Sequence, residues 1–224
     1  MRRGRLIVRL LLAAVCVLLL CGGVLAASDE VTSMSISVDA DSSSACRITI
    51  NAEMECTSAP TELVFPLHSG ASDISATGGD YKKRTVDGVP CIVFRSDAGF
   101  AGKQSFTCSY SLSGRASEQT DGQLFFLELL ERGLDYPIRA LKISMTFPSA
   151  VTVQPTWKSS YYGDVIDNYL KISIRENTVT AETTTFLKDH ETLSFRMLCA
   201  DGFFDLRHQP GKTVAVDRLA LYAL

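Results

Sequence analysis

The feature that most constrains this fold is an alternation of apolar and polar residues, which continues along most of the chain after residue 28. Successive side chains of a β-strand point to opposite faces, so an alternation of period two is typical of strands with one buried face. In residues 34–40 and 46–56 every second residue is apolar, and the polar segment between them has the composition of a turn. These two segments are therefore predicted to form a hairpin.

The same pattern recurs in several later segments, at 62–67, 84–94, 105–114, 138–148, 170–174 and 192–204. The Asp87-Gly88 pair favours a type I′ hairpin turn, and Pro66 favours an edge strand. Segment 123–133 fits a short helix as well as an edge strand. About ten strands separated by turn residues predict an all-β fold, an antiparallel immunoglobulin-like β-sandwich.

The first 26 residues have the composition of a signal peptide. Arginines at positions 2 to 9 precede an apolar run, Leu10 to Leu20, and Ala26 is the best cleavage position. The alternative is that residues 10–27 are retained as a membrane anchor, because they are almost long enough to span a bilayer. We expect a signal-peptide helix at 1–26, a β-sandwich at 27–206 with a candidate seam between two lobes at 113–123, and a C-terminal tail at 207–224.

The charge balance disfavours nucleic acid as a partner. The whole chain has a formal net charge of −3, and its first 26 residues contain four arginines and no acid. Without that segment, the chain has 18 basic and 25 acidic side chains. Such a balance repels phosphate backbones. In either reading of the N-terminus, the rest of the chain is expected outside the cytoplasm, as a secreted or membrane-anchored protein.

Five cysteines remain after the signal segment: Cys46, Cys56, Cys91, Cys108 and Cys199. Their odd number leaves at least one without a partner in the same chain. They are interpreted as buried thiols, with one disulfide of unknown pairing as the alternative. No C-x-x-C spacing indicates a metal knuckle.

The sequence offers little for catalysis. Its three histidines, His68, His190 and His208, lie far apart in turn-like contexts and are interpreted as solvated. The carboxylate pairs Glu128/Glu131 and Asp164/Asp167 have the residue types of a glycosidase site but ordinary surface spacing. No motif of a serine hydrolase, a zinc peptidase or a phosphate loop is present. We therefore expect no catalytic residue, no metal and no cofactor.

One loop concentrates large aromatic side chains. Trp157 lies close to Tyr161 and Tyr162 in a segment rich in turn residues. Clustered aromatics on a loop can stack against a sugar or a peptide. The alternative interpretation is a loop packed over the end of the sandwich. A carbohydrate-binding role predicts that all three side chains are exposed.

The second half resembles a bacterial family of predicted membrane proteins, catalogued only as domain of unknown function 2207 (DUF2207). The resemblance rests on short motifs in order along residues 31–204: Asp121 to Phe126, Pro137-Ile138, Ile143 to Pro148, Tyr162-Gly163 and Gly202-Phe203. Phe126 and Tyr136 stand where the family has tryptophans, and this chain lacks the membrane helix and glycine-rich tail that usually follow. The resemblance implies an exported bacterial β-domain and assigns no catalytic residues.

These patterns together predict a non-enzymatic interaction or sensing module of the bacterial envelope. Its expected partner is an envelope protein or a cell-wall component. Membrane attachment is open through an uncleaved N-terminal segment or a missing C-terminal helix. A carbohydrate-binding module and, less favoured, a hydrolase whose acids converge only in space are the alternatives.

Overall fold

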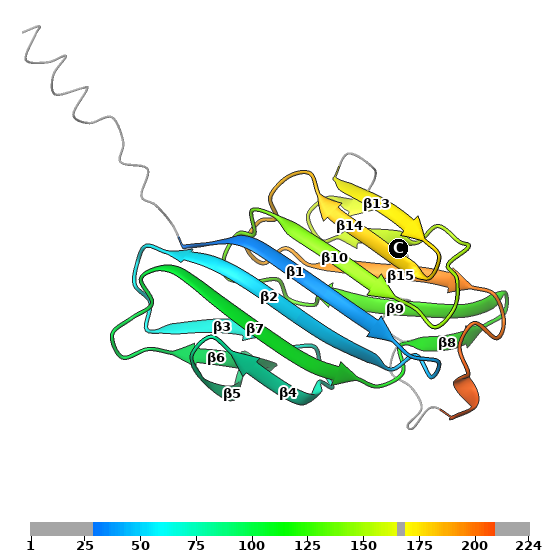
Figure 1. Cartoon of the computed structure of the whole chain (residues 1–224), viewed down its shortest axis with the longest axis horizontal. Helices are drawn as coiled ribbons and strands as arrows, with labels where there is room; N and C mark the ends of the chain where they lie inside the picture. Colours follow the sequence, from blue (N-terminus) through cyan, green and yellow to red (C-terminus); the bar gives the residue numbers. More distant parts are fainter. Residues whose placement is uncertain (1–28, 165–168, 209–224) are drawn as a thin grey trace, which may run out of the picture.

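The computed structural model describes residues 29–164 and 169–208, and in these residues the chain is built of strands with one short 3-10 helix, Leu206–His208. The strands form three sheets (Figure 1). The seven-stranded sheet has the order β13 (Leu170–Arg175), β14 (Thr178–Thr183), β10 (Leu141–Thr146), β1 (Glu30–Ala40), β2 (Cys46–Cys56), β7 (Gly102–Leu112), β4 (Ser72–Thr77). The five-stranded sheet has the order β12 (Gly163–Asp164), β11 (Thr156–Ser159), β15 (Leu193–Cys199), β9 (Gly122–Leu130), β8 (Ala116–Gln119). The three-stranded sheet has the order β3 (Glu62–Pro66), β6 (Val89–Arg95), β5 (Asp80–Val86).

The all-β prediction is confirmed, with antiparallel pairing throughout except for one pair of strands. The described residues contain fifteen strands against about ten predicted. The additional strands β4, β8, β11, β12 and β14 are short or largely polar, so each offers few apolar residues from which a strand could be predicted. Segment 123–133 forms strand β9 and no helix. The predicted signal segment, 1–26, lies outside the described residues, as does most of the predicted tail.

Strand β1 lies in the middle of the large sheet. It pairs antiparallel with β2 over its whole length and parallel with β10, where Ile36 lies opposite Ile143. A parallel neighbour needs a long crossover connection. Here the connection between β1 and β10 includes the whole three-stranded sheet and strands β8 and β9 of the five-stranded sheet. Alternation within β1 cannot reveal this partner, because both kinds of pairing bury every second residue.

The inner face of the large sheet packs on the two smaller sheets, and each contact is centred on aromatic rings. Near the three-stranded sheet, the ring of Phe106 in β7 lies 4.5 Å from Phe94 and 5.6 Å from Phe65. Near the five-stranded sheet, the ring of Phe147 lies 5.3 Å from Phe125 and 6.0 Å from Phe195. The core is therefore continuous beneath the seven strands but has two aromatic centres.

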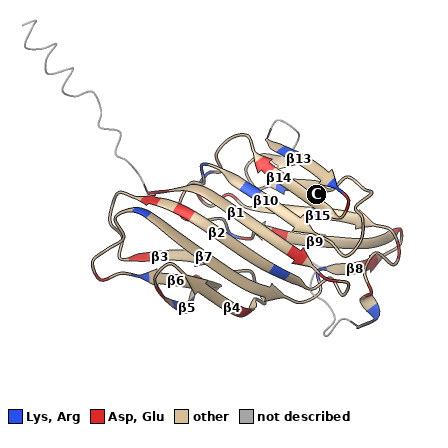
Figure 2. Cartoon of the chain, viewed as in Figure 1, with Lys and Arg blue, Asp and Glu red and all other residues tan. Residues whose placement is uncertain are grey.

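The outer face of the large sheet carries a row of hydroxyl side chains that crosses all seven strands in register. The row consists of Ser173, Thr180, Ser144, Ser37, Thr49, Ser109 and Ser75. Acidic and basic positions are scattered over the strands, and neither sign forms a patch in this view (Figure 2). An antiparallel sheet with one solvated face shows this separation of polar from apolar side chains.

Two turns confirm or explain the local chain path. Asp87 and Gly88 both have positive φ, 51° and 82°, as the predicted type I′ turn requires. Gly133 also has positive φ, 73°, and a Cβ there would lie 2.5 Å from the backbone carbon of His190. Only glycine fits where the chain after β9 passes this close to residues 190–191. Among the described residues, none belongs to a helix long and apolar enough to cross a membrane.

Candidate functional site at the junction of the smaller sheets

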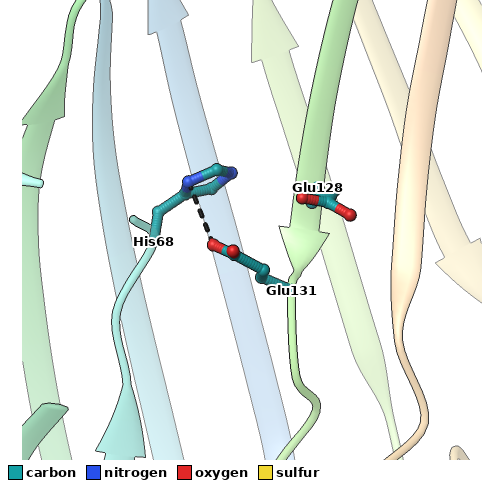
Figure 3. A group of neighbouring side chains, drawn as sticks. All are labelled: His68, Glu128 and Glu131. Carbon is teal, nitrogen blue, oxygen red and sulfur yellow. Dashed lines mark ion pairs between the residues drawn. The ribbon is translucent and has the colours of Figure 1, made fainter. Parts of the chain in front are cut away.

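The most unusual polar group of the molecule lies where the three sheets meet. His68 follows β3, Arg115 lies between β7 and β8, Glu128 belongs to β9 and Glu131 follows it. We call these four residues the His68 cluster. In Figure 3 His68 and Glu131 face each other across the junction, and Glu128 projects from strand β9, whose end leads into Glu131. Each of the three sheets thus contributes to the surroundings of one site.

A β-bulge near the end of β9 helps to bring the two glutamates together. Glu128 pairs with Ser194 and Leu130 pairs with Leu193, so β9 has one residue more than β15 over this step. Residues three apart in a regular strand point to opposite faces, whereas an extra residue returns them to the same side. One ligand atom from each of His68, Glu128 and Glu131 accordingly lies within 4.8 Å of the others.

Arg115 is held by the turn between β1 and β2. Its backbone N–H donates to the carbonyl of Ser44 at 2.9 Å, and its own carbonyl accepts from Phe126 N at 3.0 Å. Ser44 has positive φ, 62°, and is fully buried. These bonds fix the backbone of Arg115 beneath the large sheet and direct its side chain to the junction.

His68 Nδ1 is in contact with both donors and acceptors. Arg115 Nη2, which can only donate, lies 2.9 Å away, and two acceptors, the Ser69 carbonyl and Glu131 Oε2, each lie 3.2 Å away. The role of Nδ1 therefore depends on the ring tautomer. Glu131 is oriented separately, because its carboxylate accepts from Ser69 N at 2.9 Å and from Ser69 Oγ at 3.0 Å.

His68 is neutral at pH 7. Burial disfavours its charged form, and the Arg115 guanidinium adds to this effect, so that the pKa of His68 falls to about 4 although Glu131 acts in the opposite direction. The 3.2 Å contact between His68 Nδ1 and Glu131 Oε2 is thus not an ion pair at neutral pH. The fixed charges are Arg115 and the carboxylates.

Two nitrogen atoms of the cluster lack hydrogen-bond partners among the described residues: His68 Nε2 and Arg115 Nε. His68 is only 7% exposed, and an unpaired buried polar atom costs about 1–3 kcal/mol. Beside them lies a cavity of about 30 Å³ lined by His68, Glu128, Glu131 and Arg132 together with mostly apolar side chains. The cavity admits a water molecule or a small ion but no organic substrate.

A second buried polar group lies in the five-stranded half, and its geometry is complete. The Glu191 carboxylate accepts from Ser159 Oγ at 2.5 Å, from Tyr169 Oη at 2.6 Å and from Lys188 N at 3.0 Å. Glu191 is 2% exposed. Burial, followed by the bond to Glu191, raises the pKa of Tyr169, so its hydroxyl remains a donor. We call Glu191, Ser159 and Tyr169 the Glu191 cluster.

The predicted aromatic surface does not form. Trp157 is 2% exposed and its ring packs 4.9 Å from Phe195, because the alternation of β11 turns it into the core. Tyr161 and Tyr162 are exposed, with Lys188 Nζ 3.3 Å from the centre of the Tyr161 ring. The expectation of three exposed aromatics is therefore wrong for Trp157.

The five cysteines are all buried, and none forms a disulfide within the part of the chain that the structure describes. Burial raises the pKa of Cys46 and of Cys108 to about 12, so both remain unreactive thiols at neutral pH.

The interpretation of His68 as a solvated turn histidine is wrong, because the residue lies under the junction of the sheets. His190 is largely exposed, with Nδ1 3.5 Å from Asp135. Asp167 lies outside the described residues, so the interpretation of Asp164 and Asp167 as surface acids stays a prediction. The sequence marks only the Glu128/Glu131 pair of the His68 cluster, because the members come from three separate segments and the approach of the two glutamates depends on a bulge.

The sequence matches no family model and no curated protein. Solved structures share its fold. Yeast LTA4 hydrolase in complex with bestatin is 10% identical to this chain. The match covers 75% of this chain and 28% of the hydrolase, with a TM-score of 0.51. Native yeast LTA4 hydrolase is 11% identical, with 77% and 29% covered and a TM-score of 0.50. An M1 zinc metallopeptidase from Deinococcus radiodurans is 9% identical, with 75% and 42% covered and a TM-score of 0.41.

These neighbours correct the functional prediction. The chain was expected to be a non-enzymatic module, but the fold that it shares occurs within hydrolases. The alternative of a carbohydrate-binding module that uses an exposed Trp157 is also wrong, because Trp157 is buried. The chain spans less than half the length of each hydrolase that it matches. At this identity the likeness concerns the fold.

The residues of the His68 cluster do not fit a catalytic zinc. Histidine and glutamate are ligand types that zinc uses, but a catalytic site keeps an open position for substrate. Here the cavity of about 30 Å³ is too small for one. No hydrolytic step is therefore assigned to this cluster.

Proposed function

We propose that this chain is the β-domain of a hydrolase. The observation that carries the proposal is the fold shared with yeast LTA4 hydrolase over 75% of this chain at a TM-score of 0.51.

The hydrolytic centre of such an enzyme would lie in a second unit. The chain matches only 28% of the hydrolase, which leaves most of that protein without a counterpart here. The sequence has no H-E-x-x-H motif, whose two histidines and glutamate would form a zinc peptidase site. The proposed role of this domain is to pack on the catalytic unit and shape its access to substrate.

The experiment compares the full chain from two sources. Tagged protein is purified from its native host under mild detergent, and the same protein is purified alone from an unrelated host. Both samples are assayed with aminoacyl nitroanilides and nitrophenyl esters, with and without a metal chelator. We expect chelator-sensitive hydrolysis at least tenfold above background in the native-host sample and none in the isolated chain.

The control variant is Lys142→Ala, which changes one exposed side chain and keeps the fold. It should retain the hydrolysis seen in the native-host sample. Equal inactivity of both samples towards every substrate would contradict the proposal. Chelator-sensitive activity in the isolated chain would place the reacting centre in this chain and contradict the second unit.

We also infer that this sandwich, immunoglobulin-like in its stacked antiparallel sheets, works outside the cytoplasm. The support is the arginine-flanked apolar segment before Ala26. Sequencing of the mature N-terminus should find Ala27 as the first residue in the exported fraction. A chain that begins at Met1 and is found in the cytosol would contradict export.

A further inference from the structure

The His68 cluster offers ligands to a cation. Its three nearest ligand atoms, one each from His68, Glu128 and Glu131, lie within 4.8 Å of one another. Two carboxylates, Glu128 and Glu131, lie near two guanidinium groups, Arg115 and Arg132, so a cation would have to compete with the arginines for the carboxylates. The cavity beside them has room for an ion and one water.

A second observation points to the same cavity. His68 Nε2 is buried, has no partner among the described residues and lies on the edge of the ring turned away from Glu131, toward the strand that carries Glu128 (Figure 3). His68 itself lines the cavity. A nitrogen in that position can exchange its proton for a metal ion.

We propose that this cavity binds one divalent transition-metal cation of the Zn²⁺ class, with His68 Nε2 and Glu128 as ligands, and that Arg115 competes with the cation. A mixed nitrogen and oxygen set suits Zn²⁺ better than Ca²⁺ or Mg²⁺, which prefer oxygen alone. The small cavity excludes an organic substrate, so the site would be structural and would tie the chain after β3 to β9.

Binding requires a defined rearrangement. When Nε2 binds the cation, the ring proton of a neutral His68 lies on Nδ1. Nδ1–H then donates to Glu131 Oε2, which already lies 3.2 Å away. A carboxylate that holds the far nitrogen of a metal-bound histidine is the usual second partner of such ligands. Arg115 Nη2 must leave Nδ1, and this displacement weakens the affinity for the cation.

The test is a competition titration of the reduced full chain with Zn²⁺ against a fluorescent chelator. We expect one Zn²⁺ per chain, a loss of at least tenfold in affinity for His68→Ala and for Glu128→Gln, and a gain of at least tenfold for Arg115→Gln. His190→Ala is the matched control, since His190 also lies beside a carboxylate but in an exposed position, and it should leave the affinity unchanged.

A Co²⁺ spectrum separates this site from the cysteines, because thiolate ligands give an intense charge-transfer band and the proposed ligands do not. The proposal is overturned if neither the unmodified chain nor Arg115→Gln binds Zn²⁺, or if His68→Ala and Glu128→Gln, confirmed as folded by thermal unfolding, bind it as tightly as the unmodified chain. It does not depend on the hydrolase proposal, which is tested by activity.

Discussion

The two buried polar clusters of this molecule differ in how far their hydrogen bonds are satisfied. In the Glu191 cluster the hydroxyls of Ser159 and Tyr169 donate to the carboxylate. Ser159 Oγ in turn accepts from the backbone N–H groups of Tyr161 and Tyr162. In the His68 cluster two buried nitrogen atoms have no partner within the described ranges 29–164 and 169–208. A completed network stabilises one conformation, whereas an incomplete one leaves capacity for a ligand.

The largest effect is expected from removing the centre of the completed cluster. Glu191→Ala leaves the hydroxyls of Ser159 and Tyr169 and the N–H of Lys188 without their acceptor. We expect the free energy of unfolding in urea to fall by about 4 kcal/mol, since each unsatisfied buried group costs about 1–3 kcal/mol. Glu182→Ala, which removes an exposed carboxylate, is the control with an expected change within about 0.5 kcal/mol. A loss below about 1 kcal/mol for Glu191→Ala would show that the cluster is not a stabilising centre.

A smaller effect is expected from pH at the incomplete cluster. The pKa of folded His68 lies below its unfolded value of about 6.5, so the unfolded chain binds a proton first as the pH falls. Stability that is fully present above about pH 6.5 should therefore decline toward about pH 4, by about 3 kcal/mol at most. His68→Asn keeps an acceptor for Arg115 and should flatten this part of the urea-unfolding profile, whereas His190→Asn should not. Parallel profiles for all three proteins would contradict the assignment.

The smallest effect is expected from trimming the completed cluster by one atom. Tyr169→Phe removes the hydroxyl that donates to Glu191 and keeps the ring beside Tyr162. Ser159 and Lys188 still donate, so we expect a loss of about 1.5 kcal/mol in the free energy of unfolding. A loss as large as that of Glu191→Ala would mean that the network acts as one unit and not as separable bonds.

Much of the fold follows from alternation in the sequence, and its limits are physical. The strands 46–56 and 102–112 are long, and most of their alternate side chains are buried, so their pattern is unambiguous. Strand β4 lies at an edge and buries none of its residues fully, so its sequence carries no such pattern. Alternation also says nothing about which strands are neighbours, and the parallel pair of β1 and β10 could not be foreseen.

The candidate site could not be predicted from the sequence, for a different reason. His68 occupies a turn-like segment, and turn residues are usually exposed. Its burial results from the junction of three sheets, and the approach of Glu128 to Glu131 depends on a bulge in β9. Trp157 shows the reverse error, since aromatic composition favoured a surface while the short strand β11 directs the ring inward.

The position of β1 has a consequence for how the chain reaches its folded state. β2 can pair with β1 soon after synthesis, but β10 lies on the order of a hundred residues further along, so the other edge of β1 stays open until much of the polypeptide has emerged. An open edge is a template for pairing with other chains. Nascent chains of this protein should therefore depend on holding factors for longer than chains whose central strand is completed by a local hairpin.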